Sequence, residues 1–201
     1  AYLLSLRKKL EVNSVSIGRR LNIIFGIFIL LLSTTIVTNY ISVKNIESNT
    51  DEALDSRVVQ IRTIDNIRFA LGMQGLYARA LMLDNSSTNL ENFKTYQTML
   101  DDEIAHLKTL FSSKEMESYF EQMVIHNDDF NNKAAEMLSA LDRGNLDKAI
   151  DIVNDDLRDA NAGILDTSEA MIKYQDEQLV AIKEGTNQSI STTFIVALIV
   201  F

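Results

Sequence analysis

The feature that most constrains this chain is an uncharged, apolar run near its N-terminus. No charged residue occurs between Leu21 and Val43, and residues 23–32 are almost wholly apolar. A helix over residues 21–43, at about 1.5 Å per residue, is roughly 34 Å long, which is enough to cross the hydrocarbon core of a bilayer. Because lipid cannot bond free backbone groups, a transmembrane helix is the structure that we expect for this run.

Basic residues on one side of the run predict its orientation. Arg7-Lys8-Lys9 and Arg19-Arg20 precede it, so the positive-inside rule places residues 1–20 in the cytoplasm. Residues 1–16 fit either a short amphipathic helix on the inner leaflet or an unstructured tail. A cleaved signal peptide is the alternative for the apolar run, but its core is usually shorter, and no small-residue cleavage pattern occurs around Ser42.

A second uncharged segment follows Glu184. Residues 193–201 are strongly apolar, and we interpret 190–201 as the truncated start of a second transmembrane helix. No initiator methionine precedes Ala1, and we expect further sequence after Phe201 in the natural protein.

The region between the two apolar segments has the pattern of long helices. The chain contains no proline, so nothing in it forces a helix to break. The first helix is predicted to run from the membrane to about residue 83, with apolar residues at spacings of three, four or seven. This buried face consists of Leu54, Val58, Ile61, Ile64, Ile67, Leu71, Ala78 and Leu81.

Turn residues divide the remainder. Residues 84–87 are a predicted break, after which a capping box from Thr88 to Glu91 opens a second helix to about residue 111. A second capping box, Ser112 to Glu115, opens a third helix to about residue 141. Gly144 is a predicted C-terminal stop.

The C-terminal part is predicted to contain a short helical stretch over 146–153 and a last helix. In the last helix Leu157, Ile164 and Met171 recur every seven residues. The expected fold is therefore all-α: an antiparallel up-down four-helix bundle, continuous with two transmembrane helices.

Charge and composition exclude several functions. Residues 44–190 carry 14 basic and 27 acidic residues, a net charge of −13, which disfavours nucleic acid as a partner. There is no cysteine, and the two histidines, His106 and His126, lie 20 residues apart, so we expect neither a metal site nor a cofactor. No arrangement of catalytic residues stands out, and we expect no enzyme within this chain.

This layout resembles the four-helix-bundle sensory domain of the methyl-accepting chemotaxis proteins, which are bacterial chemoreceptors. Three patches strengthen the likeness: residues 77–84, residues 143–149, and the pattern Leu157-x-x-Ala160-x-x-x-Ile164-Leu165. The resemblance implies that residues 44–189 are an extracytoplasmic sensory domain at the bacterial inner membrane. It also implies a homodimer through the first helix, a small-molecule ligand, often a carboxylate, and signalling by displacement of the last helix.

Candidate ligand-binding residues are Arg68 and Arg79 on the first helix, with Thr167 and Tyr174 on the last. Arg57, Arg68 and Arg79 are 11 residues apart, so their directions differ by only about 20° per step. Arginine can clamp a carboxylate through two parallel hydrogen bonds. A solvated face balanced by nearby acids is the alternative for the arginines, and hydroxyls bonded within the bundle are the alternative on the last helix.

Other functions remain open for the same fold. The bundle can serve as the sensor of a membrane histidine kinase or a diguanylate cyclase, because helical sensor domains are shared among such outputs. It can also take its signal from a ligand-loaded binding protein. A membrane-anchored scaffold without a ligand is the hypothesis from a different class.

Overall fold

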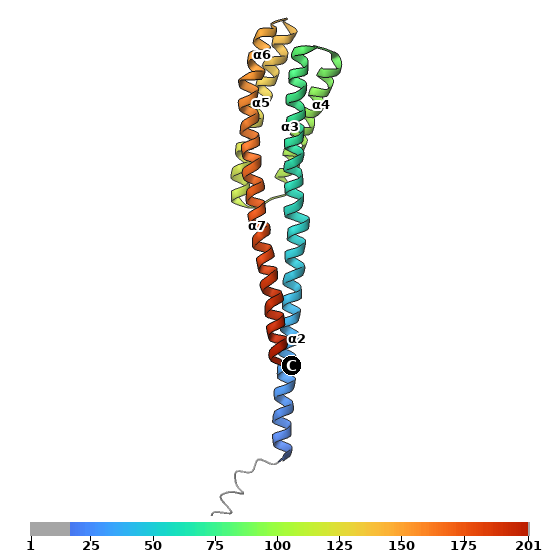
Figure 1. The fold of residues 1–201 in the computed structure, drawn as a ribbon, viewed down its shortest axis with the longest axis vertical. Coiled ribbons are helices and arrows are strands. Elements are labelled where there is room, and N and C mark those ends of the chain that lie inside the picture. The colour runs from blue at the N-terminus through green and yellow to red at the C-terminus, as the bar shows by residue number, and fades with distance from the viewer. Residues whose placement is uncertain (1–16, 201) are drawn as a thin grey trace, which may run out of the picture. The chain divides into compact units, whose positions relative to one another are not determined.

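The computed structural model describes residues 17–200, and the regular structure within this range is helical (Figure 1). The segment 1–16, predicted to be either an amphipathic helix or a tail, lies outside the described residues. In chain order the elements are α2 (Ile17–Asp51), η1 (Glu52–Val58), α3 (Val59–Leu83), α4 (Ser87–Lys108), α5 (Lys114–Asp142), α6 (Leu146–Asn154) and α7 (Asp156–Val200).

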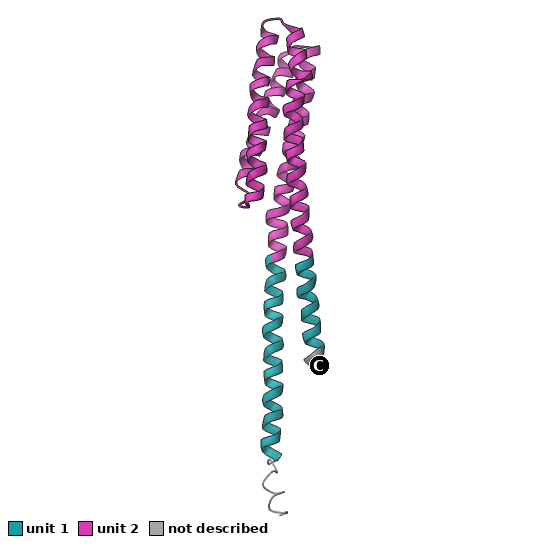
Figure 2. Ribbon diagram, turned by 90° about the vertical axis from the view of Figure 1, so that its left-hand side faces the viewer, with its two compact units in different colours: residues 1–48, 184–201 teal, residues 49–183 magenta. Residues whose placement is uncertain are grey.

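The chain divides into two compact units, one of residues 1–48 with 184–201 and one of residues 49–183 (Figure 2). In the first unit, α2 presents apolar side chains outward: Ile24, Phe25 and Leu30 are between 63% and 66% exposed. The hydroxyls of Thr34 and Thr38 donate hydrogen bonds to backbone carbonyls one turn earlier, so these polar groups are satisfied within the helix.

Within the described residues, one continuous helix, Ile17–Leu83, is long and apolar enough to cross a membrane. The described part of the predicted second span, 190–200, is helical as the end of α7. Its crossing of a membrane stays a prediction.

The second unit is an all-helical bundle of α3, α4, α5 and the first part of α7, with the short α6 packed at one end (Figure 1). The four long helices α3, α4, α5 and α7 run alternately in opposite directions (Figure 1). The four helices bury one face each in a common core. Its largest fully buried side chains are Phe93, Phe130, Ile64, Ile67, Leu71, Leu81, Leu100, Leu107, Met116, Met123, Met137 and Ile164. The predicted four-helix bundle is thereby confirmed.

The predicted helix caps are displaced by one or two residues. Ser86, not Thr88, accepts the hydrogen bond from the backbone N–H of Asn89. Ser113, not Ser112, accepts from the N–H of Met116 and begins α5. Serine or threonine occurs at both the predicted and the observed positions, so composition could not choose between them. Gly144 has a φ of 72°, as its role as a helix stop requires.

The first helix of the bundle begins with a π-helical segment, η1, rather than a regular α-helix. Leu54 and Val58, predicted to be buried, are 58% and 45% exposed. The predicted buried face is wrong here because the core starts only at Gln60, which bonds the α4–α5 loop through the carbonyl of Leu110 at 2.8 Å.

A buried polar cluster joins α3 to α7 at this end of the core. The Gln175 amide on α7 donates to the side-chain oxygen of Gln60 on α3. Arg57 of η1 donates to Gln175 at 3.1 Å and forms a 2.7 Å ion pair with Glu52. The cluster therefore ties the first helix of the bundle to the last by hydrogen bonds as well as by apolar packing.

Candidate functional site

A basic cavity lies between α3 and α7, toward the end of the bundle that carries the α3–α4 turn. It has a volume of about 360 Å³. Its residues come from α3 and α7, with one each from α5 and α6: Gly72, Gly75, Ala78, Arg79, Phe130, Val153, Leu157, Arg158, Asn161, Ala162 and Leu165. We call it the α3–α7 cavity.

Small residues on α3 keep this cavity open. A Cβ atom at Gly75 would lie 3.7 Å from both the Arg79 guanidinium and the Asn161 side-chain nitrogen. A larger side chain at this position would extend from that point into the space between α3 and α7. Gly75 therefore leaves room between the two helices at this level.

The polar groups of the cavity are mainly hydrogen-bond donors. Arg79 is exposed and donates one hydrogen bond, to the carbonyl of Gly75 at 3.3 Å. It forms no ion pair with another residue in the described range. Arg158 forms two ion pairs, at 3.3 Å with Asp159 and at 3.8 Å with Asp155, and its side chain remains 63% exposed. Asn161 adds a side-chain amide.

Such a set of groups suits a small anion. A guanidinium presents paired N–H donors that match the two oxygens of a carboxylate, and the Asn161 amide can donate to a further acceptor. The apolar side chains of Phe130 and Leu157 line the same cavity and can contact the carbon skeleton of a ligand. The donor groups of the cavity thus suit an anion, within a domain whose net charge is negative.

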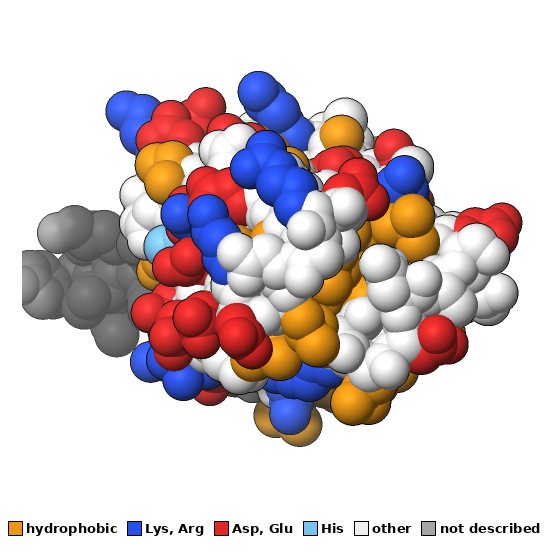
Figure 3. All heavy atoms as spheres, turned by 90° about the horizontal axis from the view of Figure 1, so that it is seen from above, with side chains coloured by type: hydrophobic (Ala, Val, Ile, Leu, Met, Phe, Trp, Pro, Cys, Tyr) orange, Lys and Arg blue, Asp and Glu red, His pale blue; other side chains and the backbone are white. Residues whose placement is uncertain are grey.

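The end of the bundle that carries the α3–α4 turn has both basic and acidic side chains on its surface. Figure 3 looks onto the end that carries the α3–α4 turn, where Lys and Arg side chains lie among Asp and Glu, with apolar patches between them. The negative net charge is therefore not spread evenly, and it leaves basic groups accessible on this face.

Of the four candidate ligand-binding residues, the structure places only Arg79 in the α3–α7 cavity. Arg68 is exposed and pairs with Asp65 at 3.4 Å. The Thr167 hydroxyl donates to the carbonyl of Gly163 at 2.7 Å and lines a different cavity, next to His126. Tyr174 packs against the core. The four side chains are not brought together into one site.

Sequence reasoning missed Arg158 and Asn161. They are three residues apart, so they share one face of α7. Each of them comes directly after an apolar residue of the Leu157–Leu165 pattern, Leu157 or Ala160. The spacing could have identified them as a polar pair on the last helix. It could not show that they face Gly75 and Arg79 of α3, because that pairing depends on the register of two helices far apart in the chain.

A buried amide on α3 has no hydrogen-bond partner among the described residues. Gln74, next to Gly75, is 0% exposed, and neither its side-chain oxygen nor its nitrogen has a hydrogen-bond partner. A buried unsatisfied amide costs about 1–3 kcal/mol. Of the two buried glutamines on α3, the Gln60 amide is thus fully bonded and the Gln74 amide is not.

Comparison with known proteins gives the class of the chain. A family model described as a four-helix-bundle sensory module for signal transduction matches residues 14–190. The chain belongs to this family of sensory modules. None of the curated proteins compared with it matches. A solved structure titled as the periplasmic sensor domain of a sensor histidine kinase is 16% identical, with a TM-score of 0.46 over 70% of this chain and 90% of that one.

Proposed function

We propose that this chain is the ligand-sensing and transmembrane part of a bacterial receptor of the methyl-accepting chemotaxis type. Its family membership supports a sensory role in signal transduction. The apolar stretch of α2 supports membrane anchoring, with residues 44–189 outside the cytoplasm. Signals pass to a cytoplasmic output domain by displacement of α7 relative to α3, through a helix shift of about 1–2 Å.

The α3–α7 cavity is the observation that carries this proposal. It joins the first and last helices of the bundle, and both helices continue without a break beyond the bundle. A ligand held by Arg79 of α3 and by Arg158 and Asn161 of α7 contacts both helices at once. Its binding energy therefore depends on their relative position, which is the requirement for a ligand to shift a conformational equilibrium.

The outer face of α3 supports a homodimer. Phe69, Leu76 and Leu83 recur every seven residues, and their side chains are 54%, 53% and 91% exposed. Gly72 lies between them, and no side chain beyond its chain neighbours and no other helix lies within 4 Å of the position that a Cβ would take there. Apolar residues at this spacing are typical of a helix that pairs with another helix. We propose that a second copy of α3 covers this face.

Thermal unfolding of the detergent-solubilised chain with a panel of small carboxylates tests the ligand proposal. A ligand at 100 times its Kd stabilises the folded state by about 2.7 kcal/mol. We expect Arg79→Gln and Arg158→Gln to abolish the shift in melting temperature, and Arg68→Gln, outside the cavity, to retain it. Stabilisation that survives both cavity variants would place the ligand elsewhere, and no stabilisation by any carboxylate would favour a binding protein or a scaffold.

The coding sequence after Phe201 tests the output. We expect the apolar segment to continue into a signalling linker and a long helical hairpin. A kinase or a nucleotide-cyclising domain in that place would keep the sensor and replace chemotaxis as the output.

A further inference from the structure

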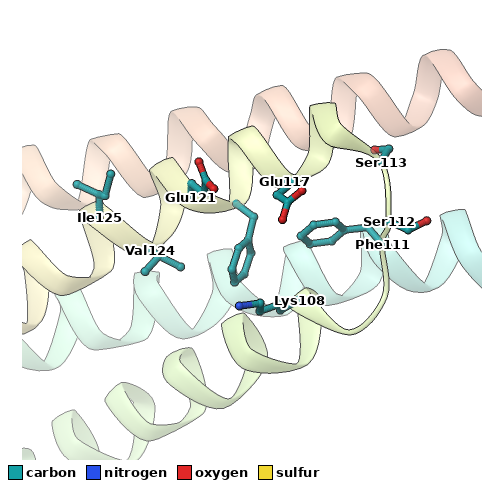
Figure 4. Close-up of a pocket in the computed structure, with 9 residues that line it drawn as sticks. Lys108, Phe111, Ser112, Ser113, Glu117, Glu121, Val124 and Ile125 are labelled. Carbon is teal, nitrogen blue, oxygen red and sulfur yellow. The ribbon is translucent and has the colours of Figure 1, made fainter.

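A second cavity opens at the other end of the bundle, where α4 turns into α5. It has a volume of about 490 Å³ and is lined by the end of α4, the connecting loop and the first three turns of α5 (Figure 4). It shares no lining residue with the α3–α7 cavity. We call it the α4–α5 cavity.

The interior of this cavity is aromatic and aliphatic. The rings of Phe111 and Phe120 are 5.5 Å apart between centroids and tilted by 54°. Val124 lies on the same side of α5, and Ile125 at the rim is 65% exposed, which is high for an isoleucine. Two tilted rings with open space beside them can take a third ring in an offset or edge-on contact.

The charges around the cavity are unbalanced. Glu117 and Glu121 lie one turn apart on α5, and both are exposed. Neither carboxylate forms an ion pair with any residue from 17 to 198. Like charges at this spacing repel one another, and a cation placed between them would relieve that repulsion. The domain also carries a net charge of −13, which attracts cations from a distance.

Lys108 supplies the one basic side chain of the cavity lining. Its Nζ lies 5.9 Å from the centroid of the Phe120 ring, in the range of a cation–π contact. It comes from α4, whereas the two glutamates come from α5. With one ammonium against two carboxylates, the cavity keeps an excess negative charge next to its aromatic side chains.

We propose that the α4–α5 cavity binds a small organic cation with an apolar ring, of the class of the arylalkylamines. The ring packs on Phe111 and Phe120, and the ammonium group donates to Glu117 and Glu121. The site is independent of the carboxylate proposed for the α3–α7 cavity. The site is also connected to the Gln60 cluster. Leu110, which precedes the cavity residue Phe111 in the chain, accepts a hydrogen bond from Gln60.

Three probes of similar size test this assignment: 2-phenylethylamine, 2-phenylethanol and 3-phenylpropionate. Because the chain has no tryptophan, Ile125→Trp places a single fluorescent reporter at the rim. Leu146→Trp, remote from the cavity, reports partitioning of the probes into the detergent. We expect a saturable change with the amine at residue 125 and none at residue 146, with the alcohol and the acid at least tenfold weaker.

Charge variants test the position of the ammonium group in the same reporter chain. We expect Glu117→Gln combined with Glu121→Gln to weaken binding of the amine about tenfold. The matched pair Asp128→Asn with Asp129→Asn, on the same helix but outside the cavity, should leave it unchanged. Lys108→Met should strengthen it. Equal binding of amine and alcohol, tighter binding of the acid, or no effect of the glutamate variants would overturn the proposal.

Discussion

The side-chain amide of Gln175 donates a hydrogen bond to Gln60, although 115 positions separate the two residues in the chain. Gln60 in turn donates to the Leu110 carbonyl at 2.8 Å and to the Ser56 hydroxyl at 2.9 Å. One buried glutamine therefore connects the first helix, the last helix and the α4–α5 loop. Because Gln60 and Gln175 are both buried, removing either side chain leaves a polar group of the other unsatisfied.

Replacing Gln60 by leucine should destabilise the bundle. The change removes the acceptor of the buried Gln175 amide nitrogen and the donor to the half-buried Leu110 carbonyl, and we expect a loss of about 1–3 kcal/mol, chiefly from the Gln175 nitrogen. Thermal unfolding followed by circular dichroism measures it. Gln97→Leu is the control, since Gln97 bonds a side chain, Asn131, in a less buried place. An equal loss of stability in the two variants would show that the Gln60 cluster contributes no more to the free energy of unfolding than a half-buried hydrogen bond elsewhere.

Replacing Gln74 by leucine should have the opposite sign. Gln74 is fully buried with both polar atoms unpaired, so an apolar side chain of similar size removes a cost of about 1–3 kcal/mol. We expect a higher melting temperature for Gln74→Leu than for the unaltered chain. A lower one would mean that the amide is satisfied in solution, for instance by an internal water molecule.

Gly163 should not tolerate a side chain. A Cβ at this position would lie 2.6 Å from carbon ring atoms of the half-buried His126 on α5, so either the ring or the packing of α5 against α7 would have to shift. We expect Gly163→Ala to lower the free energy of unfolding by about 1–3 kcal/mol. The double variant with His126→Ala should recover part of this loss. Additive effects of the two changes would rule out the predicted contact.

The two helix caps can be tested with neighbouring serines. Ser113→Ala should cost about 1 kcal/mol, because it removes the acceptor for the N–H of Met116. Ser112→Ala, one residue earlier, should change stability by less than about 0.5 kcal/mol. The reverse order would mean that α5 begins at the residue predicted from its sequence pattern.

Much of the bundle could be predicted from periodicity and turn residues. The spacing of Ile64, Ile67 and Leu71 indicated the buried face of α3, and Gly144 indicated the end of α5, because both signals are local. The face of a helix can be read from its own residues. The π-helical segment η1 could not be predicted in this way, because the residues of one helix do not show where the other helices stop covering it.

The contacts between helices that form the cavities could not be predicted from the sequence for a related reason. Arg79 could be named as a candidate, but its neighbours Arg158 and Asn161 are supplied by a helix more than 70 residues later. For His126 the sequence predicts only that it is no metal ligand, and none of its neighbours in the chain indicates that its ring lies against Gly163. Sequence patterns give orientation within one helix, whereas a site needs the register between two.

The register of α3 against α7 also limits how the length of the chain can vary among related proteins. Gln60 faces Gln175, and 15 residues further along α3 the contact is with a residue 14 positions back along α7, Asn161. Inserting or deleting one residue between these levels in either helix would turn everything beyond it by about 100° and separate one of the two contacts. Relatives that keep both contacts are therefore expected to differ in length at the turns, and hardly at all between residues 60 and 75 or between 161 and 175.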